Sequence, residues 1–181
     1  MRPPGKVPGY NKFIMTTDGH NPNVASKNTR RDARELALRM LYQLDVGRQP
    51  VDEVMEAALA QSHLDGHNRE FAADLVSGSF NNREPIDEML AEFTGDWGLD
   101  RQSAVDRNIL RLAAYELQFR PDAPVAVVCN EAVELAKKYS TAESSKFVNG
   151  VLGNLARLPR GRFGETGEND QSQDQPVDEA N

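Results

Sequence analysis

Apolar residues recur along the middle of the chain at the spacing of an α-helix. The clearest stripe has members at relative positions i, i+3, i+4, i+7, i+8 and i+11, namely Ala33, Leu36, Ala37, Met40, Leu41 and Leu44. This spacing places apolar side chains on one face of a helix. Gly47 and Pro50 follow the stripe, and both residue types are common where helices end. We therefore expect a first helix over residues 30–46.

Six further segments show the same periodicity, and no run of β-branched residues alternates as it would in a half-buried strand. Asp52 and Asp122 are expected to cap two of these helices, and Pro85 is expected to open another, because these residue types are favoured at helix N-termini. The expected segments cover about 52–59, 68–81, 85–93, 105–117, 122–139 and 141–155. The pattern predicts an all-α bundle of about seven helices joined by short loops.

The two ends of the chain lack this periodicity. Residues 1–28 are rich in Pro, Gly, Asn and Thr, and the C-terminal end is acidic, Gln-rich and nearly free of apolar residues. Such segments cannot bury enough apolar surface to offset the entropy lost on ordering. We predict a folded domain over residues 29–158, a disordered extension over 1–28 and a disordered acidic tail over 159–181.

Charges are distributed unevenly over a chain whose net charge is −7. Residues 1–48 carry nine Lys or Arg against four Asp or Glu, whereas residues 49–158 carry ten against eighteen. An acidic chain can still neutralise phosphates where its cations cluster, so the basic start indicates a local anion-binding surface. A basic terminus that is simply solvated is the alternative.

Hydropathy and cysteine content favour a soluble, cytoplasmic protein. The sequence has no run of the roughly 20 apolar residues that a membrane-spanning helix needs, and its start lacks the apolar segment of a secretory signal. A single cysteine, Cys129, excludes an internal disulfide. Cys129 lies near the apolar stripe of its helix with no histidine nearby in sequence, so we expect a buried structural thiol.

No motif for catalysis, a cofactor or a metal is convincing. The chain lacks the Gly-rich loops with which P-loop and dinucleotide-binding proteins hold phosphates. His63 and His67 have the i, i+4 spacing of two metal ligands on a helix, but Asp65 and Gly66 between them indicate a loop. We therefore expect no catalytic residue, no cofactor and no metal site.

Two further pairs of residues have structural explanations. Glu134 and Lys138 have the i, i+4 spacing of a surface ion pair on a helix. Gly150 and Gly153 have the spacing of the Gly-x-x-Gly loop of KH domains, but no strand accompanies them. We expect close packing of helices to account for these glycines.

A group of arginines at the start of the first helix stands out from this background. Arg30, Arg31 and Arg34 lie within about its first turn, where the helix dipole favours acidic residues. Guanidinium groups beside the exposed N–H groups of a helix N-terminus form a good phosphate site. A second segment, residues 146–150, combines Lys146, Phe147 and Asn149. This set suits phosphate contact, base stacking and base-edge hydrogen bonding to unpaired RNA, although Phe147 also fits a core position.

These segments carry a resemblance to the NusB family across the expected folded domain. The first helix, from Arg31 through Leu44, resembles the Arg-rich opening of that family. The segments 106–117, 130–137 and 146–152 resemble its signature, with sequences Asp-Arg-Asn-Ile-Leu-Arg-Leu-Ala-Ala-Tyr-Glu-Leu, Asn-Glu-Ala-Val-Glu-Leu-Ala-Lys and Lys-Phe-Val-Asn-Gly-Val-Leu. Asp32 departs from the pattern, because it places an acid within the basic opening.

The resemblance implies two perpendicular three-helix bundles and a role in transcription antitermination. It implies binding to the single-stranded boxA element of ribosomal RNA leader transcripts, together with NusE, a small-subunit ribosomal protein, in a complex with RNA polymerase. By matching positions, it assigns RNA contacts to Arg30, Arg31, Arg34, Lys146, Phe147 and Asn149, and places Phe71 near that surface. The sequence leaves open whether the protein is a monomer or a homodimer.

Two other functions are compatible with such a domain. Some ribosomal RNA cytosine methyltransferases carry a NusB-like domain, but the residues after Pro159 are too few to hold their catalytic domain. A purely structural adaptor for other proteins would need the acidic surface and not the arginines. Failure of Arg31→Ala and Arg34→Ala to weaken RNA binding would favour the adaptor.

Overall fold

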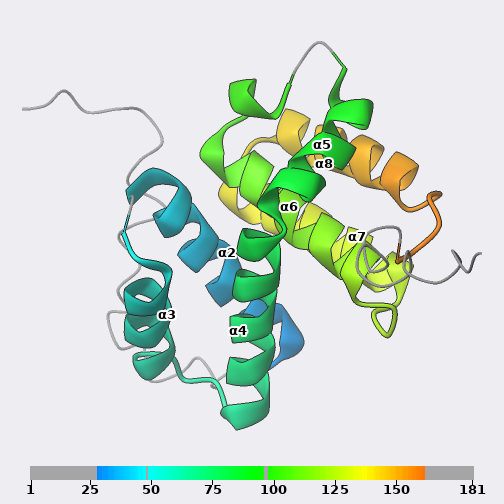
Figure 1. Ribbon diagram of the computed structural model, residues 1–181. Coiled ribbons are helices and arrows are strands. Elements are labelled where there is room, and N and C mark those ends of the chain that lie inside the picture. The colour runs from blue at the N-terminus through cyan, green and yellow to red at the C-terminus, as the bar shows by residue number, and fades with distance from the viewer. Residues whose placement is uncertain (1–27, 48, 96–97, 162–181) are drawn as a thin grey trace, which may run out of the picture.

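The computed structural model describes residues 28–47, 49–95 and 98–161 (Figure 1). Within these ranges the chain forms seven α-helices and one short 3-10 helix, with no strand, which confirms the predicted all-α fold. The predictions for residues 1–27 and 162–181 lie outside the described residues. The helices are α2 (Arg30–Gly47), α3 (Val51–Ala60), α4 (Gly66–Asn81), α5 (Arg83–Thr94), η1 (Leu99–Arg101), α6 (Ala104–Phe119), α7 (Val125–Tyr139) and α8 (Ala142–Leu155).

Side-chain caps fix the start of three helices. Asp65 accepts a hydrogen bond from the Asn68 N–H at the start of α4, so Gly66 begins that helix and does not lie in a loop. Ser103 caps α6 and Thr141 caps α8 in the same way. Each cap satisfies one of the N–H groups that a helix end leaves without an internal partner.

Three expected helix starts were wrong by two residues. Pro50 occupies the cap position of α3, so Asp52 lies inside the first turn, where the helix dipole favours an acid. The helix α5 begins before Pro85, which a first turn tolerates because its missing N–H has no partner there. Pro124 precedes α7, and Asp122 instead pairs with Arg120.

The helices form two groups joined by α6. Helix α2 packs against α4 and α3, and α7 packs against α8 and α6. Helix α6 also contacts α2 and α4, while α5 packs on α6 and α8, as Figure 1 shows. The groups α2–α4 and α6–α8 correspond to the two three-helix bundles implied by the family resemblance. No helix in the described ranges has the length and apolar character of a membrane span.

Helix α6 is buried on nearly all sides. Residues 108–118 are all buried, including Arg111, Glu116 and Gln118. Buried charges need partners, and Arg111 donates two hydrogen bonds to Asp87 at 2.7 and 2.8 Å and a third to Asp45 at 3.4 Å. The α6 charges therefore tie the central helix to α5 and α2.

Glycines have opposite roles in α4 and α8. A Cβ atom added at Gly78 would lie 1.9 Å from the ring of Tyr115, so α4 can approach α6 this closely only with glycine at this position. Gly150 and Gly153 are exposed, and a Cβ atom at either would meet nothing within 4 Å. The expectation that close helix packing accounts for these two glycines was wrong, because they lie on the outer face of α8.

Candidate nucleic-acid interface

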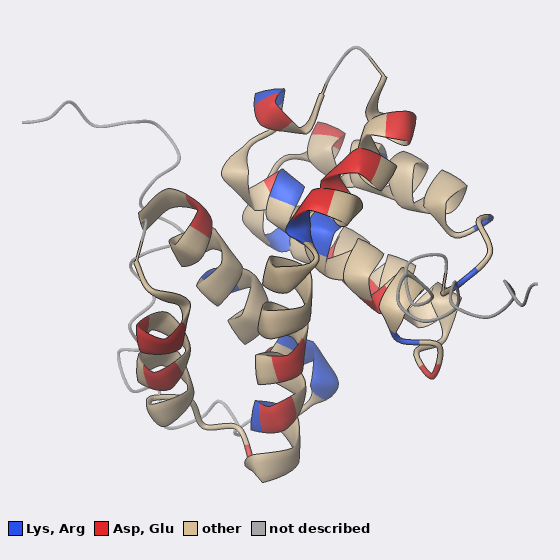
Figure 2. Cartoon of the chain, viewed as in Figure 1, with Lys and Arg blue, Asp and Glu red and all other residues tan. Residues whose placement is uncertain are grey.

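Phe71 lies at the centre of a group of three arginines. Its ring projects from α4, with the guanidinium carbons of Arg30, Arg34 and Arg120 at 4.0, 5.2 and 5.3 Å from the ring centroid. A guanidinium over an aromatic face is attracted by the ring quadrupole. We call these four residues the Phe71 cluster. Figure 2 shows the basic residues at the start of α2 beside α4.

Arg30 of the Phe71 cluster has a histidine, and not a carboxylate, as its partner. Its Nη2 lies 2.7 Å from Nε2 of His67, in the first turn of α4, and its guanidinium stacks on Phe71. Within the described residues Arg30 forms no ion pair. The Phe71 ring and His67 therefore hold this cation in place without neutralising its charge.

Thr29 and Asp32 close the N-terminus of α2. The backbone N–H and hydroxyl of Thr29 donate to Asp32 Oδ2 at 2.9 and 2.5 Å, and the Asp32 N–H donates to the Thr29 hydroxyl at 3.3 Å. This reciprocal arrangement is a capping box. The acid that departs from the basic pattern thus stabilises the helix end that carries the arginines.

Arg31 is held by a carboxylate from the other helix group. Its Nε and Nη2 donate to Glu131 of α7 at 2.8 and 2.6 Å, while 57% of its side chain stays exposed. The hydrogen bond from Arg31 holds the pKa of Glu131 below its ordinary value. Glu131 has no distinguishing local pattern in the sequence, since its partner lies 100 residues earlier.

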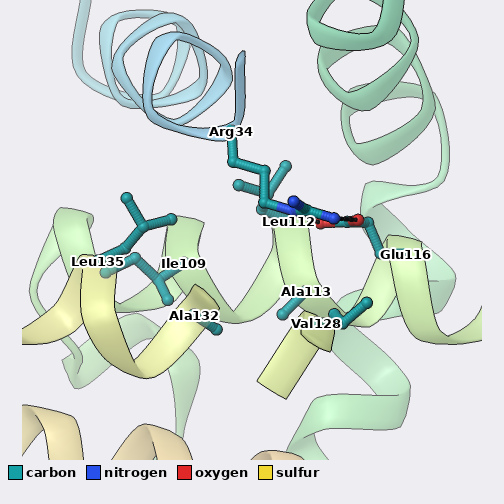
Figure 3. Close-up of a pocket in the computed structure, with 8 residues that line it drawn as sticks. All are labelled: Arg34, Ile109, Leu112, Ala113, Glu116, Val128, Ala132 and Leu135. Carbon is teal, nitrogen blue, oxygen red and sulfur yellow. Dashed lines mark hydrogen bonds and ion pairs between the residues drawn. The ribbon is translucent and has the colours of Figure 1, made fainter. Parts of the chain in front are cut away.

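Arg34 points into the protein. It is 7% exposed and donates two hydrogen bonds to the buried Glu116 at 2.8 and 2.6 Å. Figure 3 shows the pair bridging α2 and α6 above apolar side chains such as Leu112 and Val128. In this conformation Arg34 braces α2 against α6, and both oxygens of its partner carboxylate are engaged.

Arg120 belongs to the Phe71 cluster, although the sequence did not indicate it. It follows α6 directly and is held by Asp74 of α4 and by Asp122, with 23% of its side chain exposed. The hydrogen bond from Arg120 lowers the pKa of Asp122. An isolated arginine in a loop has no helical periodicity, so only the fold shows that it meets Phe71.

The second predicted segment lies on α8. Lys146 and Asn149 are exposed, whereas Phe147 is partly buried and packs against the hydrophobic core. Among the described residues, no hydrogen bond, ion pair or ring contact joins these three to the Phe71 cluster. The structure thus brings Arg30, Arg34 and Phe71 together and leaves the α8 residues as a separate part of the surface.

Other residues considered from the sequence have structural partners. Lys138 pairs with Glu35 of α2 at 2.7 Å, and Glu134 pairs with Lys137, so the expected Glu134–Lys138 pair was wrong. Cys129 is half-buried, and burial raises the pKa of its thiol. The described residues contain no cluster of His, Cys, Asp and Glu suited to a metal ion.

Comparison with known proteins identifies a family. A sequence profile described as the NusB family matches residues 31–157. The transcription antitermination protein NusB of Acetivibrio thermocellus is 44% identical over 129 residues, which cover 71% of this chain and 89% of the relative. The protein of the same name from Bacillus subtilis is 46% identical over 126 residues, covering 70% and 93%.

Solved structures agree with the sequence comparison. T. maritima NusB matches with a TM-score of 0.68 and 38% identity, covering 71% of this chain and 91% of that one. A structure described as antitermination factors NusB and NusE in complex with dsRNA matches with a TM-score of 0.66 and 30% identity, covering 71% and 96%. Because the family profile and these relatives span most of the chain, the protein belongs to the NusB family.

Proposed function

We propose that this protein is a non-catalytic, cytoplasmic transcription antitermination factor. It binds the boxA element of ribosomal RNA leader transcripts together with NusE and helps to assemble an antitermination complex on RNA polymerase. Two comparisons support this: the relatives are named transcription antitermination proteins, and one solved relative is described with NusE and RNA.

The observation that carries the proposal is the position of Arg30 in the Phe71 cluster. A guanidinium that stacks on a ring and contacts an imidazole has a fixed orientation and no carboxylate to compete with phosphate. Among the described residues, most Lys and Arg side chains form ion pairs with carboxylates, as Arg31 and Arg34 do. Arg30 is therefore the best-prepared phosphate ligand of the three arginines at the start of α2.

The other arginines have different roles in this proposal. Arg31 contacts phosphate from the exposed side of its guanidinium, while Glu131 fixes its orientation. Arg34 is a positioning residue, because its buried pair with Glu116 sets the place of α2 and hence of Arg30. Arg120 adds a third cation on Phe71.

The residues of α8 extend the RNA surface in this proposal. Lys146 and Asn149 are exposed one turn apart and offer a cation and an amide to a single strand. Phe147 contributes the exposed part of a ring that otherwise packs on the core. In this proposal one RNA strand contacts both α8 and the start of α2, and helix α7 contacts both of these helices, α8 by packing and α2 through Glu131 and Arg31.

A binding titration tests the proposed function. Fluorescence anisotropy compares a labelled boxA strand, a scrambled strand and a duplex, each with and without NusE. We expect the boxA strand to bind most tightly and NusE to increase its affinity. Equal affinity for the boxA and scrambled strands would contradict the proposed specificity, and absence of RNA binding would favour a protein adaptor.

Substitution of Arg30 tests whether its position in the Phe71 cluster supports RNA binding. Arg30→Gln should weaken boxA binding about tenfold, the worth of one charge-assisted hydrogen bond. The dependence of log affinity on log salt should become shallower by about 0.7, the value for one phosphate contact on a single strand. Arg157→Gln is the matched control, because this substitution removes the same charge and Arg157 is exposed beyond the end of α8. Equal losses in the two variants would show a general charge effect.

A further inference from the structure

His67 lies beside the Phe71 cluster and contacts Arg30. The 2.7 Å contact joins Arg30 Nη2 to His67 Nε2. A guanidinium has donors only, so this contact is a hydrogen bond only when His67 Nε2 carries no proton. Protonation of His67 would remove this acceptor and place two cations in contact.

The groups around His67 are few and mostly engaged. Arg30 faces it from α2, and Asp65 and Glu70 flank it on α4. Asp65 Oδ1 accepts from the Asn68 N–H at 2.8 Å, and its Oδ2 accepts from the Asn28 amide at 2.5 Å. The hydrogen bond from the Asn68 N–H lowers the pKa of Asp65, which stays ionised where histidine titrates.

Farther from His67, the charged groups on the other sides of Phe71 form ion pairs with one another. On the other sides of Phe71, Arg120 is bound to Asp74 and Asp122. Glu70 is exposed and one turn from His67 on the same helix. His67 itself is exposed, so a ligand bound to Arg30 from solvent also reaches the imidazole.

We propose that His67 is a phosphate-binding residue that acts with Arg30 in its protonated form, so that RNA binding takes up a proton. This inference rests on the proposed RNA-binding function. A phosphate at this position offers acceptor oxygens to both cations and replaces the hydrogen bond that Arg30 loses. Helices α2 and α4 both begin here, and the dipoles of their N-terminal turns favour an anion.

The direction of the pH effect follows from this exchange. Histidine side chains ordinarily titrate near pH 6.5. Bound phosphate attracts the protonated imidazole, whereas in the absence of phosphate only the neutral ring accepts a hydrogen bond from Arg30. RNA affinity should therefore fall by about fivefold as pH rises from 6 to 8. The salt dependence should be steeper at pH 6 than at pH 8 by up to about 0.7.

The test compares the full chain with His67→Gln and His63→Gln. Glutamine keeps an acceptor for Arg30 but cannot gain a charge, and His63 is an exposed histidine outside the cluster. Anisotropy titrations use a boxA strand with hydroxyl ends, because terminal phosphates titrate near pH 6. Calorimetry in two buffers of different ionisation enthalpy measures proton uptake directly.

We expect proton uptake and the fivefold pH effect in the wild type and in His63→Gln, and neither in His67→Gln. RNA binding with the same pH dependence in all three proteins would overturn the role of His67 and leave the proposed function intact. If no RNA binds, an NMR titration with sulfate, a dianion throughout this range, decides the case. Sulfate should shift the His67 ring signals at pH 6 and not at pH 8, and unchanged signals would overturn the inference.

Discussion

The arginines at the start of α2 differ in what their side chains do. Arg30 is stacked and forms no ion pair among the described residues, Arg31 is half-exposed and paired, and Arg34 is buried with Glu116. The sequence correctly marked the three as unusual for a helix N-terminus. It could not rank them, because Glu116 lies 82 residues and Glu131 lies 100 residues away.

At this scale we predict that Arg34→Met reduces the free energy of unfolding by about 3–5 kcal/mol. The substitution leaves the Glu116 carboxylate buried without its partner, and such groups are costly. Urea denaturation measures the effect. The double variant Arg34→Met with Glu116→Leu should recover most of the loss, and a double variant as unstable as the single one would contradict a role for the pair.

Between helices, α4 and α6 approach each other closely where Gly78 meets Tyr115. Gly78 presents only backbone to the ring of Tyr115, which also stacks on Phe119 at 5.4 Å between ring centroids. On α8 the glycines face solvent instead. Glycine thus permits the contact of α4 with α6, whereas in α8 it only lowers the stability of the helix.

We predict that Gly78→Ala lowers the free energy of unfolding by about 1–3 kcal/mol, because the added methyl forces Tyr115 or the helix to move. Thermal denaturation followed by circular dichroism measures this. An unchanged melting temperature would mean that α4 and α6 do not cross this closely in solution.

On the outer face of α8 the opposite sign is expected. Gly150→Ala and Gly153→Ala should each raise the unfolding free energy by about 0.5–1 kcal/mol, since alanine favours the helix and meets nothing within 4 Å. The same denaturation experiment serves as the measurement, and Gly78→Ala is the internal contrast. Destabilisation by both α8 variants would show that a neighbour absent from the described contacts packs there.

Across the whole molecule, carboxylates of one helix group bind cations of the other. Asp45 of α2 accepts from Arg107 of α6 at 2.6 Å, and Glu131 of α7 accepts from Arg31. Burial opposes the ionisation of Asp45 more than any single neighbour favours it, but Arg107, Arg111 and Asn108 together outweigh burial and lower the pKa of Asp45. Ion pairs therefore contribute to holding the two groups together.

Lowered carboxylate pKa values make the stability of the protein sensitive to acid. As pH falls, the unfolded chain takes up protons before the folded one, so the free energy of unfolding decreases below about pH 5. Glu131→Gln removes one such group, and its stability should vary less between pH 5 and pH 3. Urea midpoints at pH 7, 5, 4 and 3 test this. Parallel pH profiles for the variant and the wild type would contradict the assignment.

The sequence by itself determined the helices, the all-α class and the two candidate RNA segments. These depend on periodicity, caps and local charge, which act within one or two turns of helix. Tertiary structure alone decided which of the three arginines lacks a carboxylate partner among the described residues, that Lys138 pairs with Glu35, that Arg120 contacts Phe71 and that His67 contacts Arg30. The physical reason is that exposure and ion pairing depend on residues distant in the chain, which meet only when α2, α4, α6 and α7 pack together.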